Sequence, residues 1–133
     1  MTGMTTVTLN ADGPHSSGYT LEVAQAVAEG MRVLNYATRE GADGLESPAD
    51  VASVAGEIRA AAERLDQLTR QLGEFLARHQ AEGELRVTHG PYEGHPEQAV
   101  AAAQSSLDQA LEAAKHLAHA WRAVHNTTSA ISF

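Results

Sequence analysis

Cysteine is absent from this chain of 133 residues, and its absence removes several kinds of site at once. A chain without cysteine forms no disulfide, has no thiol nucleophile and offers no sulfur ligand to zinc. The absence of cysteine does not identify the cellular compartment, because exported bacterial helical proteins can lack cysteine as well. Long apolar runs are also missing, since no stretch approaches the roughly 20 apolar residues that a membrane-spanning helix needs.

Residues 1–13 lack the basic region and the apolar stretch of a secretory signal peptide. We therefore expect a soluble, cytoplasmic protein that makes no membrane contact. Lysine is scarce too, since Lys115 is the only one beside eight arginines. Together with the abundance of alanine, this usage resembles the coding bias of high-GC bacteria and indicates a bacterial source.

Basic residues are fewer than acidic ones, with 9 Lys and Arg against 17 Asp and Glu, which gives a net charge of −8. The basic residues are scattered singly, whereas nucleic-acid binding depends on a basic patch that neutralises phosphates. We therefore expect no nucleic-acid partner. Serine nucleophile elbows, phosphate loops, dinucleotide fingerprints and the Glu-x-x-His pairs of di-iron bundles are all missing. We expect neither catalysis nor a cofactor.

Two long segments repeat apolar residues at alternating spacings of three and four. The first repeat consists of Val51, Val54, Ile58, Ala61, Leu65, Leu68, Leu72 and Phe75. The second consists of Val100, Ala103, Leu107, Ala110, Ala114, Leu117, Trp121 and Val124. This spacing places the side chains along one side of a helix, which is stable only when it packs against another helix. The repeats therefore predict an all-α protein.

Turn residues and helix starts divide the chain into three helices. Ser47 and Pro48 form a typical helix start, and Pro96 opens the last helix. The expected helices span residues 20–39, 48–80 and 96–126, after a flexible or extended segment of residues 1–18. Within residues 19–133 they predict an up-down-up bundle in which the two long helices carry the heptad pattern.

Two short segments alternate polar and apolar residues in the manner of β-strands. One lies within residues 5–9 and the other is Leu85 to Thr88. In an up-down arrangement both would lie at the same end of the bundle. There they would pair as a small two-stranded ribbon.

The first helix is shorter than the other two, so it cannot cover their whole apolar surface. Exposing Leu and Phe to water is unfavourable by roughly 25 cal/mol per Å². A homodimer would remove this exposure; the alternative is that the two alternating segments and Ile131-Ser132-Phe133 fold back over the gap. The expected interface and core residues are Leu65, Leu68, Leu72, Phe75, Leu107, Leu117 and Trp121. The sequence thus favours a small helical protein-interaction module, an adaptor, accessory or regulatory protein, whose partner is a second copy or another protein.

Histidines provide the first alternative, a metal- or ligand-binding bundle. Glu112, His116 and His119 stand at i, i+4 and i+7, so one helix face presents all three, a spacing at which carboxylate and imidazole can bind zinc. The predicted apolar row points that face away from the core, which favours a solvated surface. His79, His89 and His95 lie near the end of the second helix and in the following loop, where they would converge on a metal or form a pH-sensitive joint.

A linear motif provides the second alternative. Tyr36-Ala37-Thr38-Arg39-Glu40 resembles the Tyr-x-x-x-Asp/Glu pattern of helical-hairpin substrates of actinobacterial type VII secretion. Here the motif ends the first predicted helix instead of following a hairpin, and the Trp-x-Gly turn of the small secreted hairpins is missing. The resemblance implies an exported substrate, in contrast to the cytoplasmic protein expected from the rest of the sequence.

Overall fold

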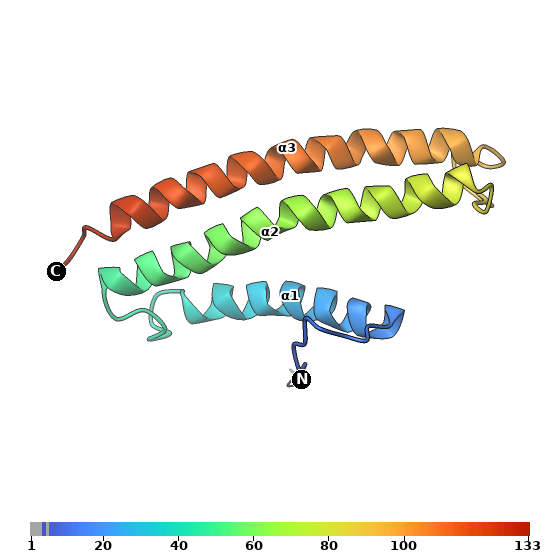
Figure 1. Cartoon of the computed structure of the whole chain (residues 1–133). Helices are drawn as coiled ribbons and strands as arrows, with labels where there is room; N and C mark the ends of the chain where they lie inside the picture. Colours follow the sequence, from blue (N-terminus) through green and yellow to red (C-terminus); the bar gives the residue numbers. More distant parts are fainter. Residues whose placement is uncertain (1–3, 5) are drawn as a thin grey trace. The chain divides into compact units, whose positions relative to one another are not determined.

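The computed structural model describes residue 4 and residues 6–133 (Figure 1). It contains three helices, α1 (Ser17–Ala37), α2 (Pro48–Ala81) and α3 (Pro96–Thr128), and no strand among the described residues. The all-α class and the three helices are thereby confirmed. No helix in this part of the chain is both long enough and apolar enough to span a membrane. The chain divides into two compact units, Met1–Glu46 and Ser47–Phe133.

Local capping interactions set the ends of α2. The backbone N–H of Ser47 donates to the Asp50 carboxylate at 3.2 Å, and Pro48 is the first helical residue. Gly83 follows the last turn with φ +70, a conformation that few residues other than glycine adopt readily. The N–H of Gly83 donates to the carbonyl of Gln80 at 3.0 Å, so the chain leaves the helix at this point.

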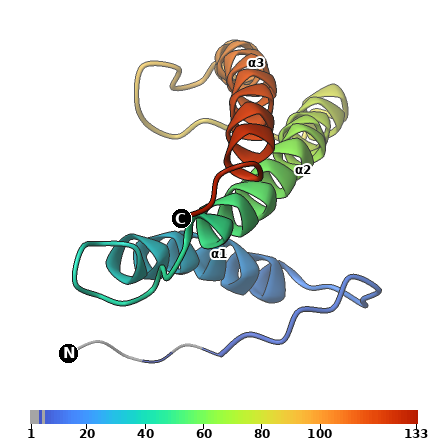
Figure 2. The same ribbon diagram turned by 90° about the vertical axis from the view of Figure 1, so that its left-hand side faces the viewer.

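Helices α2 and α3 form an antiparallel hairpin, joined by the loop of residues 82–95 (Figures 1 and 2). Along α2, buried and half-buried residues recur at Ala52, Ala55, Arg59, Ala62, Asp66, Thr69, Gly73 and Leu76. Along α3 they recur at Gln104, Leu107, Leu111, Ala114, Ala118, Trp121, His125 and Thr128. Contacts of Gln104 with Gly73 and of His125 with Ala52 place the two sets against each other. We call these two sets the contact rows. Each repeats at spacings of three and four, which keeps one side of a helix turned towards its partner.

Small residues dominate the buried part of the contact rows. Ala55, Ala62 and Ala114 are only 1%, 4% and 2% exposed. Side chains of this size let the two backbones approach closely. At Gly73 the missing side chain leaves room for Gln104, because a Cβ atom there would lie 2.9 Å from the Oε1 atom of Gln104. The hairpin is therefore held by close packing of small side chains.

Polar contacts fix the register of the hairpin along its length. Gln104 donates through Nε2 to the carbonyl of Gly73 at 2.7 Å. Towards the other end, Nδ1 of His125 lies 2.8 Å from the carbonyl oxygen of Ala52. Because these carbonyls belong to α2 and the side chains to α3, both bonds depend on the correct alignment of the two helices.

The apolar repeat predicted on α2 lies one residue before its contact row. Leu68 precedes Thr69 and Leu72 precedes Gly73, and one residue turns an α-helix by about 100°. Leu68 and Leu72 consequently remain 49% and 53% exposed. The large apolar side chains of α2 thus form a second row beside the row that packs on α3.

The predicted two-stranded ribbon is not borne out, since neither alternating segment is a strand among the described residues. The apolar side chains of each segment lie near residues of its own unit, although Leu9 remains 75% exposed. Val7 and Leu9 lie against α1 near Gly30, and Leu85 and Val87 lie against the loop end of the hairpin. Of the segment 1–18, predicted to be flexible or extended, residues 1–3 and 5 lie outside the described residues.

Enlarging a contact-row alanine tests the close approach of the two helices. We expect Ala114→Leu to lower the free energy of unfolding by about 1–3 kcal/mol, because added methylenes have no room between the helices. The control Ala123→Leu lies on an exposed part of the same helix, and we expect it to change stability by less than about 0.5 kcal/mol. Urea unfolding followed by circular dichroism and Trp121 fluorescence measures both. Equal stability of the two variants would contradict the observed packing.

Candidate interaction surface

One side of the hairpin is charged. A groove between the helices is lined by Glu63 and Gln67 of α2 and by Lys115, His119 and Arg122 of α3. Oε1 of Glu63 accepts a hydrogen bond from Nη2 of Arg122 at 2.9 Å. All of these residues come one position after the contact row of their own helix. In this antiparallel pair the positions after the two contact rows therefore share one side.

The positions before the two contact rows must then share the opposite side. From α2 these residues are Val51, Val54, Ile58, Ala61, Leu65, Leu68, Leu72 and Phe75. From α3 they are Ser106, Ala110, Ala113, Leu117, Ala120, Val124 and Thr127. We call this set the uncharged face, because none of its residues carries a charge. Ala103, the next α3 residue of the series, lies beside Leu85 and Val87, so the loop borders the face at that end.

The uncharged face leaves large side chains in water. Leu65, Phe75 and Leu117 are 40%, 52% and 45% exposed. Single exposed apolar residues are normal on protein surfaces, whereas a contiguous apolar patch marks an interaction site. The pattern here is contiguous along α2. It stands out further because the whole chain has a net charge of −8.

The structure separates the seven interface and core residues predicted from the sequence into two groups. Five of them lie on the uncharged face: Leu65, Leu68, Leu72, Phe75 and Leu117. The other two, Leu107 and Trp121, lie half-buried in the contact row of α3. The apolar spacing on α3 combines positions from both rows, which is why the sequence did not distinguish them.

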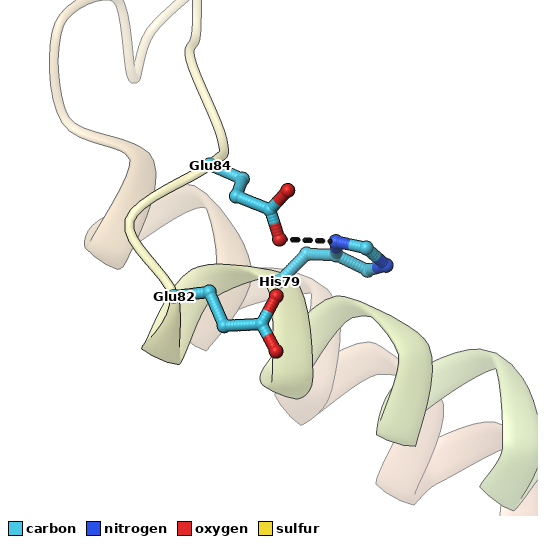
Figure 3. Close-up of side chains that lie close together, drawn as sticks. All are labelled: His79, Glu82 and Glu84. Carbon is cyan, nitrogen blue, oxygen red and sulfur yellow. Dashed lines mark hydrogen bonds and ion pairs between the residues drawn. The ribbon is translucent and has the colours of Figure 1, made fainter.

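The loop end of α2 brings together one predicted and two unpredicted candidate metal ligands (Figure 3). His79 lies beside Glu82 and Glu84, with one ligand atom of each within 4.8 Å of the others. The Nδ1 atom of His79 is 2.9 Å from Oε1 of Glu84. Hydrogen bonds with the Glu82 carboxyl and the His79 ring hold the pKa of Glu84 below its ordinary value. The signal in the sequence was the short His79-x-x-Glu82-x-Glu84 spacing across the turn at Gly83.

The other candidate ligands make different contacts. His89 lies 3.3 Å from the Thr88 hydroxyl, and His95 lies 3.7 Å from Glu97. On α3, Glu112 pairs with Lys115 at 3.6 Å. The remaining two, His116 and His119, are exposed on the same helix. In the part of the chain that the structure describes (residue 4 and residues 6–133), one set of three candidate ligands lies close enough together to hold a metal ion: His79, Glu82 and Glu84.

The Tyr-x-x-x-Glu motif lies at the end of α1. Tyr36 is in the last turn of the helix and is 51% exposed. The guanidinium groups of Arg32 and Arg39 lie 5.6 Å and 5.0 Å from the centre of its ring. Glu40 follows after the helix has ended. The tyrosine therefore has a local arginine environment that also stabilises the end of α1.

The ion pair between Glu63 and Arg122 predicts a change in the Glu63 pKa and in the pH dependence of stability. The hydrogen bond from Arg122 lowers the pKa of the Glu63 carboxyl in the folded chain. A lowered folded-state pKa adds stability above the unfolded-state pKa, and this stability is lost as the pH falls through the folded-state value. We expect Arg122→Ala to raise the Glu63 pKa towards its ordinary value, measured by NMR titration of side-chain carboxyl carbons. In the control Arg86→Ala the Glu63 pKa should not move; if both variants behave alike, the pair is not formed.

Comparison with protein-family models, with curated proteins and with solved structures finds no match for this chain.

Proposed function

We propose that this chain is a small helical protein-interaction module, an adaptor, accessory or regulatory protein, and that its contact surface is the uncharged face of the α2–α3 hairpin. The observation that carries the proposal is the continuous row of half-exposed large residues without any charge, which includes Leu68, Leu72 and Phe75. In this proposal the module works as a homodimer and its role is non-catalytic.

Burial of these side chains supplies the driving force for association. Fully burying a Leu or Phe side chain stabilises by about 1.5–3 kcal/mol, so covering a half-exposed one contributes about 1 kcal/mol. Several such residues occur in one row, and their contributions combine when one partner covers them all. The charged side of the hairpin offers less, because exposed ion pairs contribute about 0–1 kcal/mol each.

The up-down-up three-helix bundle belongs to this proposal as a prediction. Helix α1 has 21 residues and α2 has 34, which correspond to about 31 Å and about 51 Å at 1.5 Å per residue. A helix of the length of α1 is therefore too short to cover the long pair, and in this proposal it packs elsewhere on the hairpin, so that the uncharged face stays available to a partner. The cytoplasmic location and bacterial source also stay predictions, with type VII export as the alternative.

Thiol labelling inside the producing cells tests whether the face is a contact surface. The chain has no cysteine of its own, so Leu68→Cys gives a single reporter on the face. Gln71→Cys gives a matched reporter on an exposed part of α2 outside the face. We expect the thiol at position 68 to react at least about tenfold more slowly, because a partner shields it.

Two results would count against the proposal. Equal labelling of both thiols in cells would show that nothing covers the face. Slow labelling at position 68 that persists in a purified monomer would show that the chain covers its own face, which would then not be an interaction surface.

A metal-binding module is the second candidate, favoured by the group of His79, Glu82 and Glu84. One imidazole nitrogen and two carboxylate oxygens suit zinc, with water completing the coordination. We expect zinc, followed by isothermal titration calorimetry, to bind with at least about tenfold lower affinity to His79→Ala. The control His95→Ala removes a loop histidine and should bind like the unaltered chain.

The same titration tests the alternative on α3. A loss of affinity in the double variant His116→Ala, His119→Ala, with His79→Ala unaffected, would place the metal on α3. Unaltered binding by all the variants would exclude both groups.

A further inference from the structure

We propose that the occupant of the uncharged face is a second copy of this chain, arranged so that α2 of each copy lies antiparallel on α3 of the other. The inference rests on the proposed function, which already includes the homodimer, and adds to it the helices that meet and their relative direction. The result is a four-helix bundle of two hairpins whose two-fold axis runs parallel to the helices. Three properties of the face support this arrangement.

Charge is the first property. In a two-fold dimer each residue near the axis meets its own copy, so a charged face would bring like charges together. Most of the surface of this chain would cause such repulsion between two copies, because its net charge is −8. The uncharged face would cause much less repulsion, since its rows contain no Asp, Glu, Lys or Arg, and the Arg78 guanidinium lies only over its end, 5.6 Å from the Phe75 ring centre. It is therefore a surface on which two identical acidic chains meet with little repulsion across the contact.

Area is the second property. The row from Val51 to Phe75 covers 24 steps of the helix, or about 36 Å, and two adjacent helices are about 20 Å wide. One copy therefore contributes roughly 700 Å², and the pair buries roughly 1,400 Å² in total, within the range of about 1,200–2,000 Å² of stable complexes. The face of a single hairpin is thus large enough for a stable dimer without help from α1.

Shape is the third property, and it selects the orientation. Gly73 lies beside Gln104 and Leu107 across the hairpin, so the large residues in the C-terminal half of α2 lie level with small residues of α3. Leu68 and Leu72 form a ridge, and Ala110 and Ala113 form a flat strip beside it.

A two-fold axis parallel to the helices places the ridge of each copy over the flat strip of the other. An axis perpendicular to the helices would place the two α2 helices on each other. Their large side chains would then meet large side chains, for example Leu72 and Phe75 against Val51 and Val54. Packing large residues against small ones fills space with less strain, which favours the first arrangement.

Light scattering of the purified full-length chain tests the partner. We expect a particle of twice the chain mass of 14.1 kDa. Leu68→Glu places a charge on the face and should raise the dissociation constant at least 100-fold. Gln71→Glu adds the same charge outside the face and should leave the dimer intact. A monomer at 100 µM, or a dimer unaffected by Leu68→Glu, overturns the inference.

Mixing single-cysteine chains tests the orientation. We expect chains with Leu68→Cys and Ala113→Cys to form a disulfide with each other, identified by mass spectrometry of the linked peptides. Chains with Leu68→Cys and Ala61→Cys should not link, because the two α2 helices lie diagonally opposite. The reverse result overturns the arrangement.

These experiments distinguish the hypothesis that a second copy is the partner from the hypothesis that the face is an interaction surface. A monomer in vitro together with a shielded thiol at position 68 in cells overturns the second copy as partner and supports a different protein on the same face. A monomer whose position 68 is also unshielded in cells overturns the proposed function as well.

Discussion

The close contact between the small residues of α2 and α3 is the constraint on which the hairpin depends. Ala62 on α2 lies beside Ala114 and Ala118 on α3, and Gly73 makes room for Gln104. This packing brings the two backbones together but buries few large side chains. Leu65, Leu68, Leu72 and Phe75 are left one position away, on the side of the hairpin. The uncharged face is thus a direct consequence of how the hairpin is built.

Local signals made the helices predictable from the sequence. Pro48, Pro96 and Gly83 act within a few residues of themselves, and they lie at or beside helix ends in the structure. The choice between neighbouring rows was not predictable in the same way. On α2 the apolar pattern runs through Leu65 and Leu68, whereas alanine, threonine and glycine make the contact with α3. Hydropathy ranks the larger residues first, but close approach of two helices depends on small size.

The candidate sites were also predictable from the sequence only in part. The sequence identified four residues of the uncharged face because they repeat along α2, and it identified Leu117 on α3. It did not separate the rest of the α3 half from the contact row: Ala110 belonged to the predicted repeat, and Ala113 carries no signal by itself and gains meaning only beside α2. It also missed Glu82 and Glu84 as neighbours of His79: their short spacing was a signal, but the contact itself depends on the turn at Gly83. Contacts that depend on a turn or a second helix require the three-dimensional arrangement.

The offset of one residue between the contact row and the uncharged face separates two tasks within a single helix. Residues such as Ala62 and Gly73 hold the hairpin together, and residues such as Leu68 and Leu72 are available to a partner. Because the two sets do not overlap, substitutions on the face would, under the proposed function, alter which partner is recognised while the fold is preserved. Such a helix can diverge in specificity during evolution without passing through unfolded intermediates.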